Sequence, residues 1–267
     1  MMNETITSRR NPLAQRARAV RDGREKESVF VEGVRLCEEA LRASVEFEAV
    51  LYTRALADDE RGRKLLERLR EVCPNTHAVS EDVLESVSDT KTPQGVVALA
   101  RRLRTGRERI ERAAGVPLVV VMHEANNPSN VGAVLRVAEA AGATGVILTK
   151  GSTDPLSPKS LRGSMGSAFR LPLWTGPTLG EALDWCDSHG IGTVATAAGA
   201  SSVHTELDWT PPRAILLGPE AGGLSAEELR ATNAAVRIPM RKPVESLNLA
   251  TALAVLLYEA ARQRGFI

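Results

Sequence analysis

Polar and glycine residues that could hold a small ligand follow three expected strands of this chain. Asn130 lies in a run of amide residues after the first strand, and Arg136 comes six residues later. Residues 218–220 (Gly-Pro-Glu) follow the second strand, and residues 238–240 (Ile-Pro-Met) end the third. In open parallel sheets, ligands bind in the crevice beyond the carboxyl ends of the strands. We therefore expect the three turns to meet around one ligand, with backbone amides and carbonyls reading an adenine.

Each of these residues also has an ordinary structural explanation. Asn130 could cap the helix that follows it, and Arg136 could be a solvent-facing arginine in the second turn of that helix. The Gly-Pro-Glu turn could be a plain strand-to-helix connection, with Ser225 as the cap of the next helix. Ser246 could cap the last helix, with Asn248 in its first turn. The three turns taken together, rather than any one of them, favour a binding site.

Other common catalytic and nucleotide-binding patterns are absent from the sequence. It contains neither G-x-G-x-x-G after a strand nor G-x-x-x-x-G-K-[ST], and residues 163–167 have the wrong offsets for G-x-S-x-G. The four histidines have no metal-ligand spacing, so we expect no metal. His204, with Ser201, Ser202 and Asp208 nearby, could be read as a hydrolytic set. Proximity in sequence does not make a catalytic triad, so we do not favour that interpretation.

The composition is that of a globular protein whose charges nearly balance. The chain has 267 residues, of which 43% are hydrophobic, 25% charged and 3% aromatic, and its net charge is +1. Any affinity for a nucleic acid must therefore come from local basic patches rather than from the charge of the whole chain. Two patches are visible: residues 1–26 carry seven basic and three acidic residues, and residues 101–112 carry six arginines and two acidic residues. Either patch could be a solvated surface.

Nothing in the sequence predicts export or membrane insertion. Residues 1–10 contain no apolar run, so they do not resemble a secretory signal. No apolar stretch approaches the roughly 20 residues needed to cross a bilayer. The three cysteines, Cys37, Cys73 and Cys186, are far apart, which indicates reduced thiols. We therefore expect a cytoplasmic protein.

The order of strands and helices predicts an α/β protein of two domains. We expect a small N-terminal α/β domain over residues 1–103, in which residues 1–28 form a basic extension with a loosely attached helix. Residues 104–115 form an arginine-rich linker, and residues 116–267 form a domain with a mostly parallel sheet and helices on both faces. The expected strands cover residues 30–31, 47–52, 76–79, 95–100, 118–122, 145–148, 191–196, 214–217 and 235–239. The expected helices cover residues 34–41, 60–72, 81–86, about 131–141, 178–189 and 246–264.

The three turns resemble the three motifs of the SpoU family of RNA ribose 2′-O-methyltransferases. The matching residues are Asn130, Gly132 and Arg136 in the first motif, Gly218, Glu220 and Gly223 in the second, and Ser246 and Asn248 in the third. Residues 157–169 and 196–199 also resemble family segments, so the similarity runs from about residue 117 to 264. Residues 30–33 (Phe-Val-Glu-Gly) and 92–95 (Thr-Pro-Gln-Gly) resemble the ribosomal-protein-like RNA-binding domain that is attached to many members acting on rRNA.

The resemblance implies a trefoil knot in the C-terminal domain, an obligate homodimer and S-adenosylmethionine as cofactor. The residues that would hold the cofactor are Thr196, Ala197, Leu217, Gly218, Gly222, Ile238, Met240, Ser246 and Leu247. A ribose 2′-hydroxyl would attack the sulfonium methyl group directly. The catalytic residues implied are Arg136, Asn130, Glu220, Ser246 and Asn248. Arg136 would act either as the base or as a cation that stabilises the developing alkoxide.

The resemblance also makes RNA the expected partner. Arg9 and Arg10 in the N-terminal patch are candidates for RNA binding, and Lys159 and Arg162 are candidates for phosphate contacts, which position RNA without reading its sequence. The extra N-terminal domain favours rRNA, most simply that of the large subunit, over tRNA. Two alternatives stay open: a tRNA 2′-O-methyltransferase, and a catalytically silent, ribosome-associated RNA-binding protein. Antibiotic self-resistance through rRNA methylation would use the same chemistry and differ only in the target nucleotide.

Overall fold

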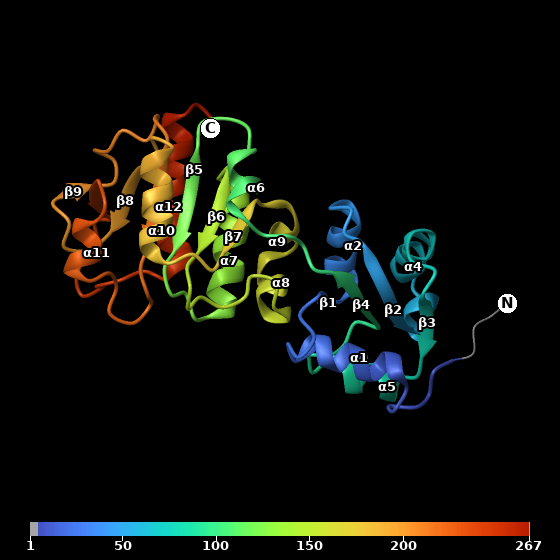
Figure 1. Ribbon diagram of the computed structural model, residues 1–267. Helices are drawn as coiled ribbons and strands as arrows, with labels where there is room; N and C mark the ends of the chain where they lie inside the picture. Colours follow the sequence, from blue (N-terminus) through green and yellow to red (C-terminus); the bar gives the residue numbers. More distant parts are fainter. Residues whose placement is uncertain (1–4, 267) are drawn as a thin grey trace. The chain divides into compact units, whose positions relative to one another are not determined.

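The computed structural model describes residues 5–266, and these residues form two compact units (Figure 1). Unit 1 extends to Arg104 and also contains Leu156–Arg170. Unit 2 consists of Thr105–Pro155 and the residues from Leu171 onward. A segment within the family-like part of the sequence therefore belongs structurally to unit 1.

Unit 1 contains a mixed four-stranded sheet in the order β1-β4-β2-β3. Strand β4 is antiparallel to both of its neighbours, and β2 runs parallel to β3. The strands are β1 (Ser28–Glu32), β2 (Phe47–Thr53), β3 (Thr76–Val79) and β4 (Val96–Arg101). The helices are α1 (Pro12–Arg21), α2 (Val34–Arg42), α3 (Arg54–Asp58), α4 (Glu60–Val72), α5 (Glu81–Val87), α8 (Pro158–Ser164) and α9 (Ser167–Arg170).

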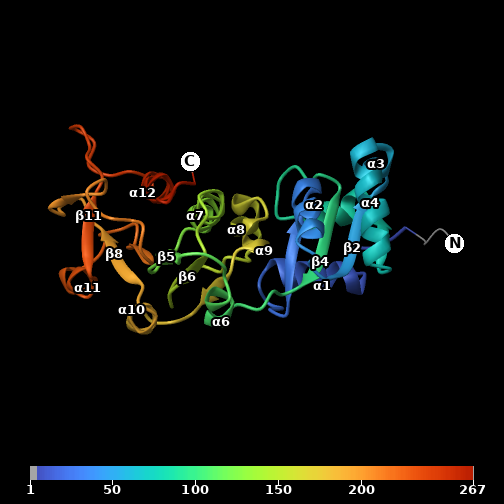
Figure 2. The same cartoon turned by 90° about the horizontal axis from the view of Figure 1, so that it is seen from above.

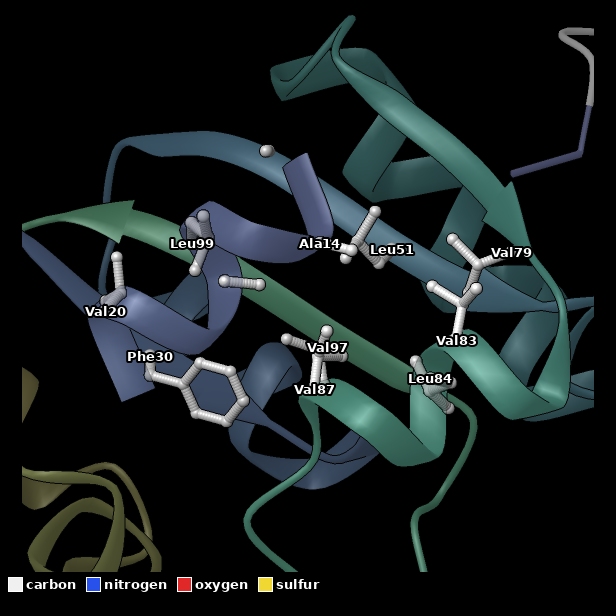
Figure 3. Packing of buried hydrophobic residues seen from close by; sticks show 12 residues of the cluster. Ala14, Val20, Phe30, Leu51, Val79, Val83, Leu84, Val87, Val97 and Leu99 are labelled. Carbon is white, nitrogen blue, oxygen red and sulfur yellow. The ribbon is translucent and has the colours of Figure 1, made fainter. Parts of the chain in front are cut away.

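One hydrophobic core of unit 1 lies between this sheet and helices α1 and α5. Phe30 of β1, Leu51 of β2 and Leu99 of β4 pack in one cluster with Val20 of α1 and Leu84 of α5 (Figure 3). Every second residue of a strand lies on the same face of the sheet, and this face packs against the two helices.

Helix α1 is an integral part of that core, so the expectation of a loosely attached N-terminal helix was wrong. Ala14 and Ala17 are 0% exposed and Val20 is 5% exposed. Arg16, part of the predicted basic patch, donates a hydrogen bond of 2.6 Å to Glu48 in β2. The small apolar residues of α1 are interspersed with arginines. The number of charges in residues 1–26 therefore gave no indication that this helix has an apolar face.

Unit 2 is built on a seven-stranded sheet in the order β7-β6-β5-β10-β8-β11-β9. All of its strand pairs are parallel, which confirms the expected α/β class with a mostly parallel second sheet. The strands are β5 (Leu118–Met122), β6 (Gly145–Leu148), β7 (Leu173–Thr175), β8 (Gly192–Thr196), β9 (Ser202–Val203), β10 (Arg213–Leu217) and β11 (Ala234–Arg237). The helices are α6 (Arg107–Glu111), α7 (Pro128–Ala140), α10 (Leu179–Ser188), α11 (Ala226–Arg230) and α12 (Leu249–Gln263).

Helices cover both faces of this sheet. Helices α7 and α12 lie side by side on one face, and α6 and α10 lie on the other (Figure 2). On the second face, Val121 and Leu216 of the sheet pack with Ile110 of α6 and Trp185 of α10. Strand β5 is buried along its whole length, as its uninterrupted apolar sequence predicts for a central parallel strand. The trefoil knot implied by the family resemblance stays a prediction.

None of the helices within residues 5–266 is both long enough and apolar enough to span a bilayer.

Candidate active site

A pocket of about 580 Å³ opens where β8, β10 and β11 end. Leu216 of β10 pairs with Ala195 of β8, and Thr196 of β8 pairs with Val236 of β11. The three neighbouring strands therefore end level with one another, and the turns that follow them surround a single space. This is the crevice at the carboxyl ends of parallel strands in which ligands of open α/β sheets bind.

The loop after β10 forms one wall of the pocket and depends on a glycine at its first position. A Cβ atom on Gly218 would lie 2.8 Å from Leu224 Cγ and 2.9 Å from the Leu224 backbone nitrogen. Gly222 and Gly223 adopt φ angles of +91° and +67°, which favour glycine. The Gly223 amide donates to the Pro219 carbonyl at 3.2 Å. The loop thus folds back tightly on itself and presents its backbone to the pocket.

Helix α11 anchors the far end of this loop. Ser225 and Glu228 form a capping box, in which the Ser225 amide donates to Glu228 at 2.6 Å. That hydrogen bond holds the pKa of the Glu228 carboxyl below its ordinary value. Glu228 Oε1 also lies 3.0 Å from Nε2 of His123, which directly follows β5. The other ring nitrogen of His123 lies 3.0 Å from the Thr149 hydroxyl, so these contacts join the pocket loop to the ends of β5 and β6.

A hydrogen bond between two asparagines connects the first and third family motifs. Asn248 Nδ2 donates to Asn130 Oδ1 at 3.0 Å, while Asn248 Oδ1 caps α12 by accepting from the Ala250 amide at 3.0 Å. Two expectations were wrong here. Helix α7 starts at Pro128 with Asn127 as its cap, so Asn130 is free to face Asn248. Helix α12 starts at Leu249, so Asn248 rather than Ser246 is its cap.

Nearly all the residues expected to act in catalysis or to hold the cofactor lie around this one pocket. Those that line it are Asn130, Thr196, Ala197, Leu217, Gly218, Glu220, Gly222, Ile238, Met240, Ser246, Leu247 and Asn248. Leu217, Ile238 and Leu247 line the pocket together with Ala197 and Gly218. A volume within about 300–1,000 Å³ and a mostly apolar lining with a few polar groups suit a nucleoside-sized ligand.

Sequence reasoning missed several other residues of the lining, including Arg237, Glu245 and Leu256. Asn248, Ala252 and Leu256 follow one another at intervals of four along α12 and share one face of that helix. That spacing could have identified Leu256. No sequence pattern placed Arg237 and Glu245 in the pocket, apart from their position next to motif residues.

Arg136 does not line this pocket. It is exposed on α7 and makes no hydrogen bond or ion pair with any residue from 5 to 266. Residues six apart on a helix are separated by about 9 Å along the axis and point in different directions, so Arg136 and Asn130 do not share a face of α7.

The candidate RNA-binding residues have different surroundings. Arg9 and Arg10 are exposed before α1, and Arg9 lies 3.8 Å from Asp82 in a solvent-exposed ion pair. Lys159 is exposed in the first turn of α8. Arg162, also on α8, instead donates a hydrogen bond of 2.6 Å to Asp89 within unit 1.

The described residues contain no group of three or more His, Cys, Asp or Glu side chains that could hold a metal ion. The pocket therefore offers backbone groups, two amides, two hydroxyls, two carboxylates, one guanidinium group and apolar side chains as its means of binding a ligand.

Comparison with known proteins matches both parts of the chain. The SpoU rRNA Methylase family model matches residues 117–258, and the MRM3-like substrate binding domain model matches residues 13–98. An uncharacterized tRNA/rRNA methyltransferase of Synechocystis sp. is 35% identical over 97% of this chain and 94% of the relative. A 23S rRNA (uridine(2479)-2′-O)-methyltransferase of Streptomyces viridochromogenes is 32% identical over 97% of this chain and 92% of the relative. The crystal structure of the SpoU methyltransferase AviRb from Streptomyces viridochromogenes, in complex with the cofactor AdoMet, superposes with a TM-score of 0.84 at 31% identity, covering 96% of this chain and 98% of that one. The chain belongs to the SpoU rRNA methylase family.

Proposed function

We propose that this protein methylates a ribose 2′-hydroxyl of large-subunit rRNA and uses S-adenosylmethionine as the methyl donor. The observation that carries the proposal is the single pocket lined by residues of all three family motifs, two of which the Asn130–Asn248 hydrogen bond joins. Relatives along nearly the whole chain support the substrate, because one of them is a 23S rRNA 2′-O-methyltransferase. We also place the protein in the cytoplasm, where rRNA is made and modified in bacteria.

The pocket suits the proposed cofactor. Leu217, Ile238 and Leu247 would pack against an adenine, and the backbone at Ala197 and Gly218 would bond its edge. When bound, S-adenosylmethionine supplies a sulfonium methyl group as the electrophile. The chain's task is to hold a ribose hydroxyl in line with that group, because positioning of two reactants can lower the barrier by several kcal/mol.

The polar residues at the rim of the pocket have the chemistry to prepare the hydroxyl. Asn130 and Glu220 line the pocket and can orient the hydroxyl through hydrogen bonds. Arg136 would act as a fixed positive charge that stabilises the alkoxide as it forms, since a guanidinium group keeps its proton under ordinary conditions. Ser246 and Asn248 would shape the same site.

The position of Arg136 favours a homodimer in which this residue serves the pocket of the partner. Arg136 is exposed and lies outside its own protomer's pocket lining, so a single protomer holds an incomplete site. Five large apolar side chains are also exposed on the same unit: Phe266 at 62%, Val244 at 52%, Val116 at 49%, Tyr258 at 42% and Leu247 at 38%. Burying such residues against a second copy would be favourable.

Mixed dimers test this arrangement. One protomer would carry Arg136→Ala, and the other a pocket filled by Gly218→Leu. If Arg136 acts across the dimer, the mixed dimer has one complete site and regains activity that neither pure variant has. If Arg136 acts within its own protomer, the mixed dimer stays inactive. A monomer in sedimentation at micromolar concentration would exclude the dimer itself.

Transfer of labelled methyl groups to RNA lacking its own modifications tests the function. Separated rRNA and tRNA pools would be incubated with the wild-type protein and S-adenosylmethionine. We expect label in large-subunit rRNA and none in tRNA. Label in tRNA alone would make the protein a tRNA methyltransferase. A folded protein that binds the cofactor but labels neither pool, nor rRNA within precursor particles, would be a silent RNA-binding protein.

A further inference from the structure

The two family-like segments of unit 1 that the proposed chemistry does not use meet around a second pocket. This pocket has a volume of about 320 Å³ and is lined by residues of unit 1 only. Residues 32–36 and Glu39 form one side, residues 90–94 form another, and Arg162 and Met165 of the α8 segment form a third. Segments about 60 and 130 residues apart in sequence thus build one cavity.

Hydrogen bonds between protein groups fix the segments that line this pocket. Glu32 is 5% exposed and accepts from the Asp89 amide at 2.9 Å and from the Thr90 hydroxyl at 2.6 Å. Gln94 Oε1 accepts from the Val34 amide at 3.1 Å. Gly33 has a φ angle of +96°, and a Cβ atom there would lie 2.8 Å from Gln94 Oε1. The pocket is therefore preformed, which lowers the cost of binding.

Hydrogen-bond donors remain unused inside the pocket, while its acceptors are largely occupied. Arg35 and Thr92 are exposed, and their side chains make no hydrogen bond or ion pair with any residue between 5 and 266. Nη1 of Arg162 is buried without a hydrogen-bond partner among the described residues and lies 3.8 Å from Glu32. A buried donor without a partner is costly, so a ligand that supplies an acceptor would be favoured.

We propose that this pocket binds one unpaired nucleotide of the RNA substrate through the acceptor edge of its base. The inference rests on the proposed function and names where unit 1 holds that RNA. Leu36 and Met165 offer an apolar wall for the base, and Arg35, Thr92 and Gln94 offer donors for its edge. Guanine presents two adjacent acceptors that suit an arginine. The small volume excludes a duplex, and proteins read RNA sequence mainly at unpaired bases.

Binding of unmodified rRNA to the full-length protein tests the proposal. We expect Arg35→Ala to raise the dissociation constant for rRNA about tenfold and Thr92→Ala about threefold, the effects of losing a charged and a neutral hydrogen bond. The affinity for S-adenosylmethionine should not change. Arg63→Ala is the matched control, because Arg63 is an exposed arginine of unit 1 whose side chain makes no hydrogen bond or ion pair within residues 5–266 and lies outside this pocket. It should change the affinity for rRNA less than twofold.

The dependence of binding on salt distinguishes a base from a phosphate. Loss of one phosphate contact lowers the slope of log affinity against log salt by about one. We expect the slope of Arg35→Ala to match that of the wild type. A slope lowered by about one would assign the pocket to the RNA backbone and overturn recognition of a base.

A cysteine placed in the pocket gives a second readout that does not depend on changes in affinity. The three native cysteines are buried, and burial raises the pKa of the Cys37 and Cys186 thiols to about 12. They should therefore react slowly with iodoacetamide. We expect rRNA, but not S-adenosylmethionine, to protect Thr92→Cys from alkylation, while Arg63→Cys stays reactive.

The outcomes separate this inference from the proposed function. Wild-type protein that methylates rRNA, with pocket variants that bind rRNA normally and a Thr92→Cys thiol that stays reactive, would overturn the pocket assignment alone. Wild-type protein that neither binds nor methylates any RNA would overturn the proposed function and this inference together.

Discussion

A single added methyl group at Gly218 should weaken cofactor binding strongly. In Gly218→Ala, the new Cβ would lie 2.8 Å from Leu224 Cγ and 2.9 Å from the Leu224 backbone nitrogen. The side-chain atom could rotate away, but the backbone atom can give way only if the loop moves. Overpacking of this kind costs about 1–3 kcal/mol. Because the loop lines the pocket and binding must restore its position, most of that cost should appear in the dissociation constant of the cofactor.

The expected change is large enough to measure by isothermal titration calorimetry. About 2 kcal/mol corresponds to a dissociation constant for S-adenosylmethionine roughly 30-fold higher than that of the wild type. Gly199→Ala is the matched control, because no atom lies within 4 Å of the added Cβ at that position. A Gly218→Ala protein that binds the cofactor within about threefold of the wild type would refute the reasoning, since about 1 kcal/mol is the smallest expected cost.

Three further predictions follow from the site and from α12. Arg136→Ala should lower the rate of methyl transfer about 100-fold or more in single-turnover assays, while calorimetry finds cofactor binding unchanged; an equal loss of both would make Arg136 structural. Asn248→Ala should lower the free energy of unfolding in urea by about 1–2 kcal/mol through loss of the α12 cap, and Asn248→Asp, which keeps a capping oxygen but loses the donor to Asn130, should recover most of it. Hydrogen bonds from Arg262 and then Gln263 lower the pKa of Glu259 from 4.5 to about 2. A carboxyl whose pKa is lower in the folded state than in the unfolded state stabilises the protein at pH values above its unfolded-state pKa. The thermal stability of the wild type should therefore exceed that of Glu259→Gln at pH 7, and the difference should shrink as the pH falls from about 4.5 toward about 2.

The sequence was sufficient to predict a mostly parallel second sheet and the meeting of the three motifs, but not the strand order or the short edge strands β7 and β9. Strand β5 was predicted at its observed bounds because an unbroken apolar run of five residues can only be buried on both faces. The expected start of α7 lay three residues too late, although the sequence contains the signal for the correct start. Asn127 followed by Pro128 is a common cap and first-turn pair, and it should have outweighed Asn130.

Tertiary contacts decided what local sequence could not. Ser246 and Asn248 are both good capping residues, and the structure gives the role to Asn248, whose side chain also donates to Asn130. Arg162 carries a positive charge that suggested a phosphate contact, yet it bonds to Asp89, which is 73 residues away in sequence. Neither pairing leaves a periodic signal, because each joins segments that approach only after the fold has formed.

The most direct test of the proposed function is to identify the methylated nucleoside. Unmodified large-subunit rRNA would be labelled by the wild-type protein, digested to nucleosides and analysed by mass spectrometry, with Arg136→Ala in parallel. We predict that the added methyl group resides on the ribose of one nucleoside, that the adjacent phosphodiester resists alkaline cleavage, and that the variant gives no such product. A methyl group found on a base would contradict the proposed attack by a ribose 2′-hydroxyl.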